Sequence, residues 1–120
     1  MINLPIFRAK SNEQKNTYVE GLLMGVDEEL NLCTIRTKDD YIGGEICYIH
    51  TLSINFPDML DSQGNKIFAS LSEDGKGGDI MKDDDYYGSA KYINCEFVVE
   101  YENCYDNISE GNFEVVGVPE

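Results

Sequence analysis

The fold of this chain is decided by the stretch Asp61-Ser62-Gln63-Gly64-Asn65-Lys66-Ile67-Phe68 and, after a short interruption, by Gly78-Asp79-Ile80-Met81-Lys82. Gly64 and Asn65 tolerate the positive φ that a tight turn requires, and Asp61 can cap that turn through its carboxylate. A strand is expected to start after each of the two turns. An order of turn, strand, turn and strand is typical of a small β domain.

Short runs of β-branched and aromatic residues extend from this stretch in both directions, whereas helical periodicity is hard to find. We therefore expect a mainly β chain, a small antiparallel barrel-like domain over residues 1–120 with at most one short helix, near Pro57–Leu60. An acidic loop is expected over residues 72–78. The expected strands are Val19–Val26, Leu30–Thr37, Tyr41–Ile49, Lys66–Leu71, Asp79–Lys82, Ala90–Glu102 and Phe113–Val118.

Three details of these strands can be read from residue types. Ala90–Glu102 alternates apolar and polar side chains, which predicts one long strand with one face on the core. Charged hairpin loops are expected at residues 27–29 and 38–40, and a bulge or bend at Gly43-Gly44, because an interior glycine has no side chain to pack. Pro57 cannot donate to a ladder and should end the pairing of the segment before it.

Length and composition predict a single domain in the cytoplasm. A chain of 120 residues with 42% hydrophobic content can form one core, and it offers no continuous apolar run typical of a signal peptide or membrane span. The cysteines form no C-x-x-C pair, so we expect reduced, buried or half-buried thiols, no metal and no cofactor. Cys95 and Cys104 are the pair that a hairpin could bring together. The other two are Cys33 and Cys47.

The net charge of −14 is unevenly spread. Residues 1–60 carry five basic and nine acidic side chains, whereas residues 61–120 carry four and fourteen. Because so acidic a surface repels phosphate backbones, direct nucleic-acid binding is not expected. The same charge suits a basic protein partner or, alternatively, mimicry of nucleic acid.

Several segments, taken in order, resemble the YopX family of phage and prophage proteins. The chain departs from the family's pattern at Asn55–Asp58, where the family has a Gln-Tyr-Thr-Gly turn, and in carrying residues 69–77 as an insertion. The similar segments are Ile6–Lys10 with Tyr18–Leu23 (family Phe-Arg-Ala, then an aromatic strand), Asp61–Phe68 (Asp-x-x-Gly-x-x-Ile-Phe), Gly78–Met81 (Gly-Asp-Ile) and Phe113–Gly117 (Phe-Glu-Val-Ile-Gly). The resemblance implies a barrel-like β fold and a phage, prophage or mobile-element origin in a bacterial host cell. It implies no catalytic residues, because the family has no established activity.

Three motifs resemble known kinds of site, and each is better explained without a ligand. The run Asp83–Asp85 lacks the glutamate that a calcium loop needs at its twelfth position, which is Asn94 here. The segment Gly75–Gly78 lies between expected strands among carboxylates, unlike a phosphate-binding loop that opens a helix. His50 is the one plausible neutral-pH general base, and a strand-end histidine of no catalytic role is the favoured interpretation.

Tyrosines next to carboxylates give the candidate binding surface, which comprises Asp83, Asp84, Asp85, Tyr86 and Tyr87. Tyrosine rings provide contact area at low entropy cost, and acids steer a basic partner. The sequence thus predicts a non-catalytic binding or accessory module with a phage or host protein as partner and no membrane contact. The alternative is an acidic nucleic-acid mimic that inhibits a host nuclease or DNA-binding protein. Self-association stays open, since Ala90–Glu102 could pair at an edge.

Overall fold

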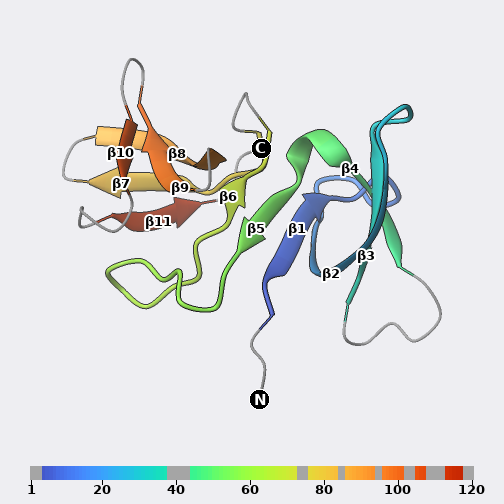
Figure 1. Ribbon diagram of the computed structural model, residues 1–120, viewed down its shortest axis with the longest axis horizontal. Coiled ribbons are helices and arrows are strands. Elements are labelled where there is room, and N and C mark those ends of the chain that lie inside the picture. Colours follow the sequence, from blue (N-terminus) through green and yellow to red (C-terminus); the bar gives the residue numbers. More distant parts are fainter. Residues whose placement is uncertain are drawn as a thin grey trace.

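The computed structural model describes residues 4–37, 44–72, 76–83, 86–93, 96–101, 105–107 and 113–117. The chain is mainly β, as predicted, and its strands form one sheet that curls into a half-barrel (Figure 1). The strands are β1 (Ile6–Lys10), β2 (Tyr18–Asp27), β3 (Leu32–Arg36), β4 (Glu45–Tyr48), β5 (Ser53–Asn55), β6 (Ala69–Ser70), β7 (Ile80–Asp83), β8 (Tyr86–Ile93), β9 (Glu96–Glu100), β10 (Tyr105–Asn107) and β11 (Glu114–Gly117).

The described residues contain at most one short helical turn, as expected, but the expected position at Pro57–Leu60 is wrong. A 3-10 turn, η1, covers Ile49–Thr51, while Pro57 lies in a turn in which the Met59 N–H donates to the Phe56 carbonyl at 2.9 Å. Leu60 then bridges to Lys66, so the segment opens a hairpin and not a helix. Among the described residues, no helix has the length and apolar character needed to cross a membrane.

The strand order is β10-β9-β8-β6-β5-β1-β2-β3-β4, with β7 pairing both β8 and β11. Strands β1 to β4 form a meander in which each pairs with the next antiparallel. The sheet curls because the chain after β1 returns to the outer edge of β4, where Ser11 bridges to Cys47 and the Asn12 N–H donates to the Ile46 carbonyl at 2.8 Å. Strand β5 pairs with β1 of the meander and with β6, and the parallel pair of β6 and β8 continues the sheet into the C-terminal strands.

The single strand expected over Ala90–Glu102 is wrong. The chain reverses, and β8 and β9 form an antiparallel hairpin in which Ile93 lies opposite Glu96, with residues 94 and 95 outside the described residues. Tyr92 therefore faces Phe97, and their ring centroids are 4.7 Å apart. Alternation of apolar and polar residues continues through such a reversal, so it could not reveal the turn. Strand β9 is paired on both sides, with β8 and β10, and does not form a sheet edge.

Loop predictions were confirmed in part. The hairpin between β2 and β3 is where residues 27–29 predicted it, and Asn31 adopts a positive φ of 57°. Residues 38–40 and Gly43 lie outside the described residues. The bulge occurs in β2, between Leu23 and Gly25, and Gly44 instead precedes β4 directly, where a Cβ would lie 2.9 Å from the Ile35 carbonyl oxygen. Strand β5 ends before Pro57, as predicted.

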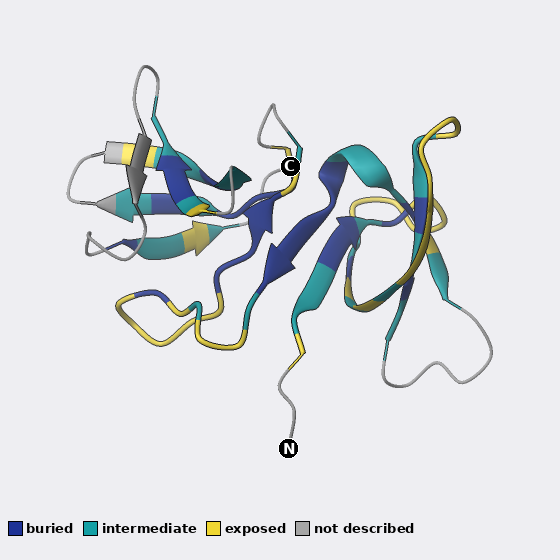
Figure 2. Ribbon diagram, in the orientation of Figure 1, coloured by how far each residue is buried: buried dark blue, intermediate teal, exposed yellow. Residues whose placement is uncertain are grey.

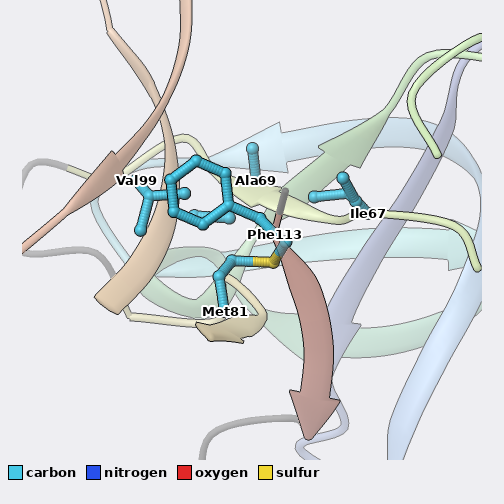
Figure 3. Close-up of a cluster of buried hydrophobic side chains, with 6 residues drawn as sticks. Ile67, Ala69, Met81, Val99 and Phe113 are labelled. Atoms are coloured by element: carbon cyan, nitrogen blue, oxygen red, sulfur yellow. The ribbon is translucent and has the colours of Figure 1, made fainter. Parts of the chain in front are cut away.

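In the described residues, the buried hydrophobic side chains form two cores that pack against the sheet. The N-terminal core lies inside the meander, and the C-terminal core lies where β7, β8 and β9 meet β6, with Phe113 packed on Val99 and Met81 (Figure 3). Figure 2 shows buried residues concentrated along β1, β5 and β6, between the two cores. The N-terminal core comprises Ala9, Val19, Cys33, Ile35, Cys47 and Leu52, and the C-terminal core Ile67, Ala69, Met81, Ala90, Val99 and Phe113.

Candidate functional site

The surface predicted from the sequence lies at the hairpin of β7 and β8. Asp83 and Tyr86 are the last backbone pair before its turn, and Asp84 and Asp85 lie outside the described residues. Tyr87 is 59% exposed, and the ammonium of Lys82, its partner across the hairpin, lies 5.7 Å from the ring centroid. The hairpin thus presents Tyr87 to solvent shortly after the acidic run Asp83–Asp85 in the sequence.

The outer face of the meander is a second exposed surface, which the sequence did not predict. Cys33 and Ile35 point into the core, so the alternate residues of β3 point outward. On that outer face Gly25, Thr34 and Ile46 lie side by side on three adjacent strands. A shallow groove of about 320 Å³ opens there. Its lining residues are Gly25, Val26, Asp27, Leu32, Cys33, Thr34 and Ile46.

Large apolar side chains in the groove and in the β2–β3 hairpin beside it remain exposed. Leu22 and Met24 precede it on β2 and are 49% and 55% exposed, and Leu30 in the following turn is 66% exposed. Val26 and Ile46 in the lining are 54% and 39% exposed. The alternation of Leu22, Met24 and Val26 in the sequence does not describe this face, because the bulge between Leu23 and Gly25 interrupts it. Leu22 lies opposite Arg36, whereas Val26 lies opposite the inward-pointing Cys33.

A buried ion pair joins the two cores. The Arg8 guanidinium from β1 donates to Asp79 Oδ1 at 2.6 Å and to the Gly77 carbonyl at 2.9 Å, and both side chains of the pair are at least 95% buried. The Phe68 N–H donates to the other Asp79 oxygen at 2.9 Å. Burial raises the pKa of Asp79, opposed by the Arg8 charge and by the Phe68 N–H.

Aromatic rings enclose the same guanidinium. Its carbon lies 4.5 Å from the ring centroid of Phe68 and 5.3 Å from that of Tyr18. Arg8 and Asp79 come from the Phe-Arg-Ala and Gly-Asp-Ile segments on which the resemblance to YopX was based. Sequence reasoning gave Arg8 no role, because nothing local indicates a partner 71 residues away.

The turn predicted from Asp61 and Gly64 is present. Gly64 has a φ of 84°, and Asp61 Oδ1 accepts hydrogen bonds from the backbone N–H groups of Gln63 and Asn65 at 2.9 and 2.7 Å. Asp61 Oδ2 accepts from the Val115 N–H at 2.9 Å, which fixes β11 to the turn. Burial acts to raise the pKa of Asp61, but these hydrogen bonds outweigh it and lower the pKa.

The segment Gly75–Gly78 was compared with a phosphate-binding loop in the sequence. Gly75 lies outside the described residues, and the described carbonyl groups of the segment accept hydrogen bonds within the fold. Gly77 has a φ of 85° and directs its carbonyl to Arg8, while the Lys76 carbonyl accepts from Ser70 Oγ at 2.7 Å. A Cβ on Gly77 would collide with the Thr51 carbonyl oxygen. Glycine is therefore required here for both its conformation and its close contact.

His50 forms part of a polar cluster at η1. Its Nδ1 lies 2.7 Å from Asn31 Nδ2, its backbone N–H donates to Asn31 Oδ1, and its ring is tilted against that of Tyr48. This network holds the β2–β3 hairpin against η1. Within the described ranges, no group of three or more His, Cys, Asp or Glu residues could hold a metal ion.

The cysteine pair expected from the sequence was Cys95 and Cys104, which lie outside the described residues. Cys33 and Cys47 instead lie directly opposite each other on β3 and β4, as free and buried thiols. Burial raises the pKa of Cys33, and burial with the nearby thiol and acids raises that of Cys47 to about 12. Two such thiols are poor nucleophiles at neutral pH.

Comparison with known proteins gives no match: no family model matches the sequence, nor does any curated protein or solved structure match the chain. The resemblance to YopX stays a prediction.

The described polar groups thus serve chiefly to hold strands together. Asp79, Asp61 and His50 are each engaged by hydrogen bonds within the fold. The features directed at solvent are the Tyr87 hairpin and the apolar groove of the meander. Contact surfaces of this kind support binding of another molecule more readily than bond-making chemistry.

Proposed function

We propose that this protein is a non-catalytic accessory module that binds a phage or host protein. The observation that carries the proposal is Tyr87, which is 59% exposed on the β7–β8 hairpin and closely follows the acidic run Asp83–Asp85 in the sequence. A tyrosine offers apolar area and a polar tip with few rotatable bonds, which suits a contact surface. The net charge of −14 favours a basic partner. The resemblance to YopX supports a phage or prophage origin.

Crosslinking from the hairpin tests this function. A photo-crosslinking amino acid placed at Tyr87 should link one specific protein in a lysate of the source cell or of phage-infected host. Tyr87→Ala should then weaken binding of that purified protein by about tenfold or more, as expected for an aromatic anchor. Tyr48→Phe is a control, because it removes a hydroxyl distant from the hairpin that bonds Asn12 at 2.8 Å. Diffuse crosslinks with no preferred protein would oppose the proposal.

The charge distribution supports a second candidate, mimicry of nucleic acid. Fourteen acidic and four basic side chains in residues 61–120 give that half a net charge of −10. Asp61 and Asp79 are buried and Glu100 pairs with Lys91, so these acids are engaged within the fold. A mimic should displace duplex DNA from a host nuclease or DNA-binding protein at salt-dependent, stoichiometric concentrations. Retention of DNA by every such protein tested would eliminate this candidate.

A further inference from the structure

We propose that the groove of the meander is a second binding site, whose occupant is an apolar protein segment that carries lysine or arginine. The inference rests on the proposed binding function, but it uses a surface separate from the Tyr87 hairpin. The observations behind it are the groove over Gly25, the exposed apolar rim and the charge around both.

The groove is open because of a bulge and a glycine. The pairing of β2 and β3 shifts between Leu23 and Gly25, and Gly25 then lies opposite Thr34. A Cβ added at Gly25 would have no atom of the described residues within 4 Å, aside from its chain neighbours. Space that a side chain of this protein could fill is therefore available to a side chain of another.

The rim of the groove is apolar. Leu22, Met24, Val26 and Leu30 are each about half exposed or more, and Ile46 lies across the groove from Gly25. Val26 and Ile46 line the groove, and Leu22 and Met24 precede it on β2, so a partner that covers this surface removes exposed apolar area from water. Met24 lies at the bulge, where an unbranched thioether can adapt to a partner's shape.

The acidic residues near the groove favour a positively charged partner. Residues 20–31 contain Glu20, Asp27, Glu28 and Glu29 and no basic residue. Asp27 lines the groove, and Glu28 and Glu29 follow it in the β2–β3 turn, whereas Glu20 lies opposite Arg8 on β1 and away from the groove. Arg36, opposite Leu22, lies at the far end of this face. An apolar segment with lysine or arginine at one end complements this arrangement.

The same charge disfavours other occupants. A second copy of the chain would bring its own Asp27, Glu28 and Glu29 to the contact, and each copy has a net charge of −14. An anionic lipid surface would be repelled in the same way. A cationic peptide is therefore the probe for this site.

The test compares peptides by amide NMR. A ten-residue peptide of alternating leucine and lysine should shift the amide signals of Gly25, Thr34 and Ile46, whereas a leucine–glutamate peptide of the same length should not. Binding affinity should fall as salt rises. Absence of shifts in these residues, or equal binding of both peptides, would overturn the proposal, as would binding to anionic vesicles or a groove-dependent dimer in light scattering.

Blocking the groove gives the decisive variant. Gly25→Leu should fill the space and weaken peptide binding by about tenfold or more. Gly117→Leu is its matched control, because Gly117 also follows a register shift, in β11, and a Cβ there has no described atom within 4 Å. Equal affinity of the two variants would refute the site. Should Gly25→Leu unfold, Glu28→Gln with Glu29→Gln should still reduce affinity for the lysine peptide, and an unchanged affinity would then refute the charge argument.

Failure here can be told apart from failure of the proposed function. Tyr87→Ala should leave peptide binding in the groove unchanged, and Gly25→Leu should leave the Tyr87 crosslink unchanged if the two surfaces serve different contacts. If the residue at position 87 crosslinks no specific protein while the lysine peptide still binds the groove, the proposed function of the hairpin fails and the groove remains as the binding site.

Discussion

The two cores are assembled in different ways. The N-terminal core lies within a meander, in which β1 to β4 each pair with their neighbour in sequence. The C-terminal core collects side chains from distant segments, because β6 pairs with β8 in parallel and β11 returns to β7. Pairing between neighbouring strands closes short loops at a small entropy cost. Pairing between distant segments, as in the C-terminal core, closes long loops at a larger cost. The N-terminal core therefore depends mainly on pairing between neighbours in sequence, whereas the C-terminal core also needs the distant pairings of β6 with β8 and of β11 with β7.

The surfaces of the two halves differ in charge and in exposed apolar side chains. Residues 1–60 carry a net charge of −4 and surround a groove with exposed apolar side chains, whereas residues 61–120 carry −10. Figure 2 shows exposed residues at the β2–β3 turn, next to that groove. Among the described residues, seven exposed large apolar side chains lie in residues 1–60 and three in residues 61–120, so the half with the simpler topology presents more of them.

The largest expected effect concerns the ion pair that joins the halves. Asp79→Leu leaves the Arg8 guanidinium buried without its counter-ion and frees the Phe68 N–H, which should lower the free energy of unfolding by about 3–5 kcal/mol. Urea denaturation followed by circular dichroism measures this change. The double variant Arg8→Met/Asp79→Leu should recover much of the loss, because two apolar side chains then replace the pair. A wild-type midpoint for Asp79→Leu would show that the halves do not depend on this contact.

The second effect tests whether the two cores unfold together. Ile35→Ala in the N-terminal core and Met81→Ala in the C-terminal core should each cost about 2–5 kcal/mol, since both side chains are fully buried. Because the sheet is continuous through β1, β5 and β6, we expect each variant to weaken amide protection in both halves. Hydrogen exchange measured by NMR can show this. Faster exchange confined to the substituted half would mean that the cores open independently.

The third effect concerns the turn that anchors β11. Asp61→Asn places an amide donor or a neutral acceptor against three backbone N–H groups, which should cost about 1–3 kcal/mol at pH 7. The folded pKa of Asp61 is lowered, so its stabilisation is present above the unfolded pKa near 4 and is lost as pH falls through the folded value. The difference between wild type and Asp61→Asn should therefore shrink in acid. A difference that is constant from pH 7 to pH 3 would contradict the proposed role of the charge.

Sequence reasoning succeeded where a feature depends on a few adjacent residues. Asp61 with Gly64 specified a turn, and the acidic run after Val26 specified a hairpin, because side-chain capping and glycine φ are local properties. The predictions from sequence were wrong or missing where a feature depends on contact between two segments. The reversal between Ile93 and Glu96 leaves the alternation unbroken, and the groove depends on the bulge at Gly25 and on which face of β2 is buried. Tyr86 and Tyr87, expected in a loop, begin strand β8, and the binding role of the Asp83–Tyr87 surface stays a prediction.

The last prediction involves no change in the free energy of unfolding. It concerns the rate at which the buried thiols of the N-terminal half react. Cys33 and Cys47 are 2% and 0% exposed, and the pKa of Cys47 is raised to about 12. Because iodoacetamide reacts with thiolates, labelling of Cys47 at pH 8 should be at least about a thousandfold slower in the native protein than in urea. Peptide mass mapping distinguishes these two cysteines from Cys95 and Cys104. Since labelling requires β3 and β4 to separate, its rate measures how often the meander opens, and Met81→Ala should accelerate it if the cores are coupled. Rapid labelling of native wild type would instead identify the meander as the less stable half, despite its local pairing.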